Sequence, residues 1–305
     1  MISISKGQLT ATAYPQYGGN LASLNWKGLE LLRAPEPPDI LVEKPEHYGL
    51  PVLFPPNRIA DGHFTWNGRR CELPLNEGRP RNNHIHGLVL RQAWTIADQS
   101  DDVVVMEYRY GQHHDAFDGF PYPFCLRLSY RLDDDCLTQE LVVQNCGDTP
   151  LPYGLGFHSA FNAPKRLRIT TEPWRWEMLL PRHLPSERRL PWGDFDPNEW
   201  LDPSLGRISV HTPVGVGQLA GRPFRGAVLD YGERAFAYEI DDKFHQWFLW
   251  TPEPNSGFIC PEPMSCMVNA PNLALPPETT GFTDLAPGSE VSYRSTIREI
   301  DERGV

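Results

Sequence analysis

The sequence predicts an all-β protein with the strand spacing of a sandwich. Its 31 prolines and 25 glycines are scattered through all 305 residues, where they interrupt helices repeatedly. Short segments with alternating apolar residues recur between turn sequences. Almost no window has the apolar spacing i, i+3, i+4, i+7 of an amphipathic helix. These observations favour many short strands joined by turns.

The clearest predicted strand covers residues 124–132. Apolar side chains occupy every second position there, which gives an extended strand one apolar face, so we expect a half-buried antiparallel strand. Turn sequences such as DDD, NCGD, DYGE and APGS separate the other expected strands. These cover residues 103–110, 137–143, 235–240, 246–250 and 291–297.

No linker, internal repeat or low-complexity tract divides the chain, so we expect one domain over residues 1–305. One glycine motif, Gly215, Gly217 and Ala220, fits the dinucleotide fingerprint G-x-G-x-x-A. Gly221 and Pro223 would end the required helix almost at once, and no βαβ pattern surrounds it. We expect a glycine turn between strands.

The charge and hydropathy of the chain exclude several partners. A net charge of −11 and a pI near 5.4 disfavour nucleic acid, which is bound by clustered cations. The N-terminal residues contain no apolar stretch typical of a signal peptide, and no run of about 18 apolar residues occurs. We therefore expect a cytoplasmic protein that does not bind membranes.

The cysteines and histidines give no strong metal signal. The six cysteines contain no C-x-x-C pair, so free thiols are expected. The histidine pairs His113/His114 and His84/His86 most resemble ligands, but neither belongs to a His-Glu-x-x-His helix. We expect neither a metal nor a cofactor.

Polar residues stand among apolar strand residues in four segments, which are GLPVLFPPNRIADG, RNNHIHGLVLRQAW, LPYGLGFHSAFN and GFICPEPMSCMVNAPN. His158 in the third segment is either a partly buried functional histidine or a structural one. Glu262 in the fourth lies between two prolines, whose stiff turn would suit a catalytic carboxylate, although a solvated loop glutamate fits equally. Glu253 stands in the same Pro-Glu-Pro context.

Arg58 and His86 in the first two segments could donate charged hydrogen bonds to ligand oxygens, while a surface salt bridge is the alternative for the arginine. Tryptophans such as Trp94, Trp247 and Trp250 could offer an apolar face to a ring, and most are expected in the core.

Taken in order, these segments resemble the successive motifs of the aldose 1-epimerase (galactose mutarotase) family. TAYPQYGGNLASLNWKGLELL is similar to the family's opening strands, PNRIADGHFTWNGRRCELPLN to its arginine segment, and NNHIHG to its Asn-x-x-His-Gly segment. The run ending in LPYGLGFHSAFN resembles the strands before the catalytic histidine, ICPEPM the glutamate motif, and LAPGSEVSYRSTI the closing strand. The resemblance covers the whole chain.

This resemblance implies a large antiparallel β-sandwich of the galactose mutarotase type, with a monosaccharide in an open cleft. The implied reaction interconverts α and β anomers of an aldose without a cofactor, in a monomer or a homodimer. His158 becomes the general acid, Glu262 the general base, and Arg58 and His86 hold the sugar. Glu253 loses its claim, because the family's glutamate falls in the second tripeptide.

One departure from the family bears on the substrate. After LAGRPF the family usually has an aspartate, whereas this chain has Arg225, with Asp230 further on. Both are candidate substrate-binding residues, and Arg225 motivates an alternative substrate, an anionic sugar such as a hexose 6-phosphate, a uronate or a sulfonated sugar. Further cations that could reach the cleft rim are Arg69, Arg70, Arg79 and Arg81. A non-catalytic carbohydrate-binding module of the same fold is the other alternative.

The expected chemistry sets demands on the two pKa values. A glutamate with a pKa of about 4.3 is ionised at neutral pH and accepts a proton, and a histidine near about 6.5 supplies one after modest upward tuning. His158 and Glu262 are therefore chemically sufficient.

Overall fold

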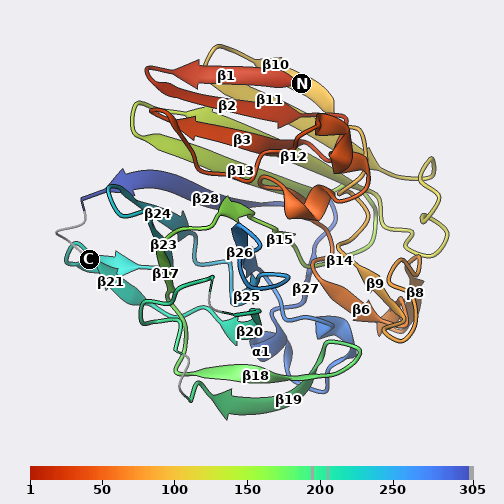
Figure 1. The fold of residues 1–305 in the computed structure, drawn as a ribbon. Helices are drawn as coiled ribbons and strands as arrows, with labels where there is room; N and C mark the ends of the chain where they lie inside the picture. The colour runs from red at the N-terminus through yellow and green to blue at the C-terminus, as the bar shows by residue number, and fades with distance from the viewer. Residues whose placement is uncertain (194–195, 205, 302–305) are drawn as a thin grey trace.

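The computed structural model describes residues 1–193, 196–204 and 206–301, and strands make up nearly all of its regular secondary structure (Figure 1). The one α-helix of this described part, α1, covers the four residues Pro277–Thr280. The strand pairs of both large sheets are antiparallel. The predicted all-β, antiparallel sandwich is thus confirmed.

The larger sheet has eight strands. Their order is β10 (Thr95–Gln99), β11 (Val103–Tyr110), β12 (Phe124–Leu132), β13 (Cys136–Asn145), β28 (Glu290–Ile300), β24 (Ala235–Ile240), β23 (Gly226–Asp230) and β17 (Arg166–Ile169). Strand β13 joins β12 to β28 from the far end of the sequence. Five of the six predicted strands lie in this sheet and are confirmed.

The smaller sheet has six strands and carries the sixth predicted one, β25 (Gln246–Trp250). Its order is β20 (Ser209–Pro213), β25, β26 (Phe258–Met264), β15 (Gly156–Phe157) and β5 (Val52–Leu53), with β16 (Phe161–Asn162) also paired to β26. All residues of β26 are buried, so this strand lies in the interior of the protein.

Aromatic contacts join the two large sheets. Phe161 of β16 packs on Tyr238 of β24 with ring centroids 5.3 Å apart, and the Ser159 and Tyr238 hydroxyls are 2.7 Å apart. One buried apolar cluster contains residues from Ile2 to Ile297. Each large apolar side chain buried there stabilises the fold by about 1.5–3 kcal/mol.

Smaller sheets and turns surround these two. A four-stranded sheet, in which β1 (Ile2–Lys6), β2 (Leu9–Tyr14), β3 (Asn20–Trp26) and β4 (Leu29–Glu30) follow in order, lies beside β10–β13 (Figure 1). The two-stranded sheets are β6 (Arg58–Ala60) with β9 (Asn83–Ile85), β7 (His63–Trp66) with β8 (Arg69–Glu72), β14 (Leu151–Tyr153) with β27 (Thr283–Leu285), and β18 (Trp174–Leu179) with β19 (Leu184–Pro191). The 3₁₀ turns are η1 (Pro38–Val42), η2 (Pro45–His47) and η3 (Ala270–Asn272).

The glycine motif near residue 217 forms a hairpin, as predicted. Its strands are β21 (Gly217–Leu219) and β22 (Arg222–Phe224), and the turn residues Ala220 and Gly221 have φ values of 51° and 75°. The six cysteines are free, also as predicted. Within the described ranges no helix has the length and apolarity to cross a membrane.

Candidate active site

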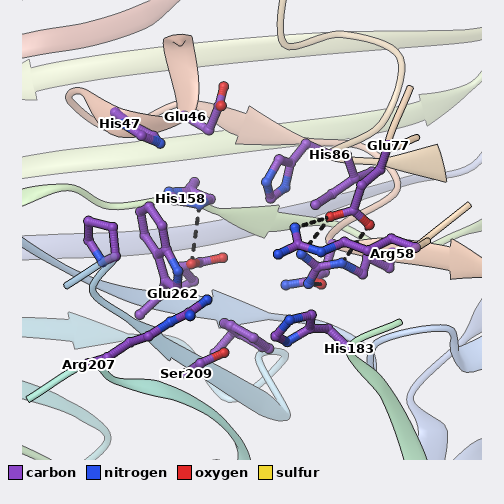
Figure 2. A pocket seen from close by; sticks show the side chains of 16 residues that line it. Glu46, His47, Arg58, Glu77, His86, His158, His183, Arg207, Ser209 and Glu262 are labelled. Atoms are coloured by element: carbon purple, nitrogen blue, oxygen red, sulfur yellow. Dashed lines mark hydrogen bonds and ion pairs between the residues drawn. The ribbon is translucent and has the colours of Figure 1, made fainter. Parts of the chain in front are cut away.

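A pocket of about 370 Å³ opens on the six-stranded sheet and is lined by 16 residues. The structure brings four of the predicted site residues together in it, namely Arg58, His86, His158 and Glu262 (Figure 2). The first and the last of these four residues, Arg58 and Glu262, are 204 positions apart in the sequence. The fold therefore joins all four motifs in one concave site of the size usual for small ligands.

Glu262 lies in the middle of β26, opposite Phe248 of β25. This differs from the stiff turn that the two flanking prolines suggested. Pro261 and Pro263 lack N–H donors, which a central strand usually needs. On its other edge β26 pairs with β15 and β16 but not with the residues between them, and His158 stands in this interval. A strand with prolines is accommodated here because the neighbouring backbone is diverted toward the pocket.

His158 follows β15 and is fixed by its backbone, whose N–H donates to the Pro51 carbonyl at 3.0 Å. Its Nε2 lies 3.2 Å from Glu262 Oε1, and the two side chains are 3% and 2% exposed. The ring also meets the Trp250 ring edge-on, with centroids 5.9 Å apart. The imidazole and the carboxyl thus form a buried pair at the pocket wall (Figure 2).

Burial shifts the two pKa values in opposite directions. It raises the pKa of Glu262 well above its usual 4.5, and the nearby Arg58 only partly offsets this. Burial, together with His47, lowers the pKa of His158 to about 3. The expected upward tuning of His158 is therefore wrong, because desolvation disfavours the charged form of each group.

The opposed pKa shifts favour a state in which the pair carries one proton. Two arrangements satisfy this, neutral His158 with protonated Glu262, or imidazolium with carboxylate. Burial favours the first, and the attraction between the opposite charges at 3.2 Å and the Arg58 guanidinium favour the second. Among the described residues, His158 Nδ1 and Glu262 Oε2 have no hydrogen-bond partner. Glu262 keeps an oxygen free to meet a ligand.

Arg58 is held in place by Glu77, which sequence reasoning missed. The guanidinium donates from Nε to Oε2 at 2.8 Å and from Nη2 to Oε1 at 2.9 Å. Glu77 also accepts from Arg81 at 2.6 Å and from Asn83 at 2.8 Å. Burial works to raise the pKa of Glu77, but the hydrogen bonds from Arg58 and Asn83 outweigh it and bring the pKa to about 2. Arg58 is thus orientated by a carboxylate that stays ionised.

His86 ends the short β6–β9 pair, in which Arg58 lies opposite Ile85. The His86 N–H donates to the Asn57 carbonyl at 2.9 Å, and its φ of 65° is left-handed. Gly87 follows with a φ of 77°, and a Cβ there would lie 2.3 Å from the Phe54 carbonyl oxygen, so this turn requires glycine. The His86 ring meets His158 edge-on at 5.0 Å, and burial holds its pKa well below 6.5.

Arg225 and Asp230 are not brought to this pocket. They adjoin or lie in β23 of the eight-stranded sheet, whereas the pocket lies on the six-stranded sheet. Arg225 Nη2 donates to the Phe244 carbonyl at 2.8 Å, and the buried Asp230 pairs with Arg166. Both side chains therefore stabilise the fold around their own strand.

Of the other residues that the sequence suggested for the site, only some line the pocket. Arg81 reaches the pocket, whereas Arg69 and Arg70 lie on hairpin β7–β8 away from it. Glu253 is exposed after β25, so only the second glutamate of the Pro-Glu-Pro tripeptides enters the site. Trp250 lines the pocket, whereas Trp94 and Trp247 are buried in the core.

Sequence reasoning missed several lining residues, chiefly His47, Glu77, His183 and Arg207. They lie in η2 and in turns or short irregular segments, where the sequence has no periodic pattern that would indicate a pocket residue. The histidine pairs that most resemble metal ligands in the sequence make local contacts instead. His84 Nδ1 bonds the Pro74 carbonyl at 2.7 Å, and His114 Nδ1 accepts from the Ala116 N–H at 3.0 Å. In the described ranges, no three His, Cys, Asp or Glu side chains are grouped to hold a metal.

Comparison with known proteins agrees with this geometry. The family model described as aldose 1-epimerase matches residues 1–298. The protein YihR of Escherichia coli K12 is 28% identical over 158 residues, which are 52% of this chain and 48% of that protein. The protein YphB of the same organism is 25% identical over 263 residues, or 82% of each chain.

Solved structures share the same architecture. A galactose mutarotase-like protein from Clostridium acetobutylicum superposes with a TM-score of 0.92 at 26% identity, covering 98% of this chain and 94% of that one. The galactose 1-epimerase of Lactobacillus acidophilus shares the fold with a TM-score of 0.76 at 14% identity, covering 97% of this chain and 92% of that one. Since the family model spans nearly the entire sequence and the fold agrees, the chain belongs to the aldose 1-epimerase family.

Proposed function

We propose that this protein is a mutarotase that interconverts the α and β anomers of an aldose. The observation that supports this most strongly is the buried His158–Glu262 pair, 3.2 Å apart, in the wall of a monosaccharide-sized pocket. Anomer exchange needs one proton removed and one delivered, at neighbouring oxygens. A pair that carries a single proton supplies both functions.

Ring opening uses the ionic arrangement of the pair. The Glu262 carboxylate takes the proton from the C1 hydroxyl, and the His158 imidazolium gives its proton to the ring oxygen. The C1–O5 bond breaks, and its electron pair stays on the oxygen as C1 becomes an aldehyde. The pair is then left as neutral His158 and protonated Glu262.

Ring closure restores the first arrangement. After rotation about C1–C2, neutral His158 takes the proton from the C5 hydroxyl as that oxygen attacks the other face of the aldehyde. Glu262 returns its proton to the former carbonyl oxygen. The cycle therefore alternates between the two one-proton arrangements. Burial favours the neutral one, and the Arg58 guanidinium partly offsets this, which reduces the free-energy difference that proton transfer must overcome.

The other pocket residues fit sugar binding. Arg58, orientated by Glu77, offers a guanidinium to hydroxyl oxygens, and neutral His86 can donate or accept beside it. The Trp250 side chain lines the same pocket and gives an apolar face for the C–H groups of a pyranose. These groups would hold the ring with C1 and O5 against the His158–Glu262 pair.

A panel of pure anomers tests the proposal. Freshly dissolved α-anomers of several aldoses, neutral and anionic, are followed by polarimetry with and without the protein. We expect relaxation to the equilibrium rotation to accelerate in proportion to protein concentration for at least one aldose. Heat-denatured protein is the control for buffer catalysis, and an unchanged rate across the whole panel would reject the proposal.

A further inference from the structure

A second chamber of about 830 Å³ adjoins the sugar pocket. Four residues line both spaces, namely Arg81, His183, Arg207 and Ser209. Strand β18 and the turn before β19 provide another part of the chamber wall. Figure 2 shows Arg207, Ser209 and His183 along one side of the sugar pocket, below Glu262. A ligand in the pocket can therefore extend past these side chains.

The chamber has a charge unlike that of the protein as a whole. Arg81, Arg175, Arg207 and His183 line it, and among the described residues no Asp or Glu belongs to its lining. The whole chain has a net charge of −11. A local excess of arginine in an acidic protein raises the local concentration of anions.

Two of these arginines have no counter-charge within the part of the chain that the structure describes. Arg81 pairs with Glu77 at 2.6 Å, a carboxylate that it shares with Arg58. Among the described residues neither Arg175 nor Arg207 forms an ion pair or a side-chain hydrogen bond. Burial lowers the pKa of His183, and the charges of Arg58, Arg81 and Arg207 lower it further. The arginine side chains therefore make the potential at the junction positive.

Apolar side chains complete the chamber and strengthen this potential. Met178, Trp192 and Ile208 stand beside the arginines. An apolar wall lowers the local dielectric, so a guanidinium there attracts an anion more strongly than it would in open water. The planar guanidinium of arginine also matches the oxygens of carboxylate, phosphate and sulfonate groups.

We propose that this chamber is an anion subsite of the sugar pocket, in which Arg207 binds a carboxylate, phosphate or sulfonate carried by the aldose. The anion lies on the part of the sugar directed away from the His158–Glu262 pair. This inference rests on the proposed mutarotase function and names its substrate class. It moves the basis for an anionic sugar from Arg225, which lies on the other sheet, to Arg207 at the pocket.

Exchange kinetics with matched sugars test the subsite. Glucose, glucuronate, glucose 6-phosphate and 6-deoxy-6-sulfoglucose are compared by NMR exchange between their anomeric protons. We expect kcat/KM to be at least about 10-fold higher for one or more of the anionic sugars than for glucose, because a charged hydrogen bond contributes that much. The three anions separate carboxylate, phosphate and sulfonate as the preferred group.

The variant Arg207→Gln should reduce this preference about 10- to 100-fold, measured as the ratio of kcat/KM for the anionic sugar to that for glucose. Arg188→Gln is the matched control, since Arg188 is an exposed arginine of β19 that lines neither chamber, and we expect it to leave the ratio unchanged. An equal loss for neutral and anionic sugars in Arg207→Gln, or no preference in the unaltered protein, would overturn the subsite.

Binding measured at His183 separates the subsite from the mutarotase function. The pKa of His183 is followed by NMR with glucose or with the anionic sugars. A rise with an anionic sugar, absent with glucose and in Arg207→Gln, supports the subsite even if no sugar exchanges, a result that would reject only the catalytic proposal. An unchanged His183 pKa at saturating anionic sugar would overturn the subsite.

Discussion

The sugar pocket and the second chamber meet at Arg207 but balance their charges differently. In the pocket, Glu77 forms ion pairs with both Arg58 and Arg81, and Glu262 faces His158. In the chamber, Arg175 and Arg207 have no such partners in the described ranges. Charged side chains that are paired with each other hold fixed positions and can exchange protons within the site. Uncompensated charges instead remain available to an external ion.

Substitutions of paired and of unpaired charged residues should therefore have different effects on activity. Changes to a closed pair leave an unpaired charge inside the protein and should impair chemistry on every substrate. Changes to an uncompensated arginine should alter only the choice between charged and neutral substrates. The predictions below test this division, beginning with the largest expected effect.

Substitution of the His158–Glu262 pair should have the largest effect. In His158→Asn or Glu262→Gln, anomer exchange should fall about 10²- to 10⁴-fold for neutral and anionic sugars alike, because each variant removes one partner of the proton transfer. NMR exchange rates provide the measurement, with circular dichroism to verify folding.

The double variant sharpens this test. Since the two groups act as one unit, His158→Asn combined with Glu262→Gln should be no more than a few-fold slower than the slower single variant. Losses that multiply, or single variants with rates near that of the unaltered protein, would contradict the paired assignment.

Glu77→Gln should have the next largest effect. Arg58 loses the carboxylate that orientates it through two hydrogen bonds, so we expect KM to rise about 10-fold, with a smaller change in kcat. Initial rates over a range of sugar concentrations separate the two constants. A lower kcat with an unchanged KM would show that Glu77 acts on the chemistry instead. Glu72→Gln, on hairpin β7–β8 outside the pocket, is the control.

Ionic strength should have a smaller effect, and this effect should differ between anionic and neutral sugars. Raising ionic strength from about 20 mM to about 500 mM should raise KM for an anionic sugar about threefold, because salt screens partly exposed charges. KM for glucose should change little. Potassium chloride titrations of both rates provide the measurement, and equal salt effects on the two sugars would indicate that the chamber arginines do not contact the substrate.

The smallest expected change concerns pH. Burial lowers the pKa of His158 to about 3, so the pair gains a second proton only well below pH 6.5, and burial raises the pKa of Glu262, so the existing proton is retained above pH 4.5. Between about pH 5 and pH 7, kcat should therefore vary less than about twofold. A titration of kcat with a midpoint near 6.5 would contradict this one-proton pair.

The sequence predicted the sheets better than the pocket. Alternating residues such as Leu126 and Leu128 mark strands directly, because the period of two reflects which face is buried. The positions of His158 and Glu262 became informative only through motif order, since each alone fits a structural role. Sequence could not show that Glu262 lies within a strand, because its two prolines are tolerated only where the neighbouring backbone is diverted.

The residues that were missed are placed by long-range packing. Glu77 lies 19 positions after Arg58 in the sequence, and Arg207 enters the pocket from the segment before β20. No local periodicity encodes either contact. Arg225 was assigned to the cleft from its order in the chain, which does not reveal that β23 belongs to the other sheet.

Saturation transfer between the anomeric protons of an equilibrated sugar tests the central claim most directly, because it separates catalysed exchange from binding alone. Saturating the α-anomer H1 should diminish the β-anomer H1 in proportion to protein concentration, and the effect should disappear in Glu262→Gln. A sugar that binds, as shown by line broadening, without transfer of saturation would contradict the mutarotase account and indicate a binding protein instead.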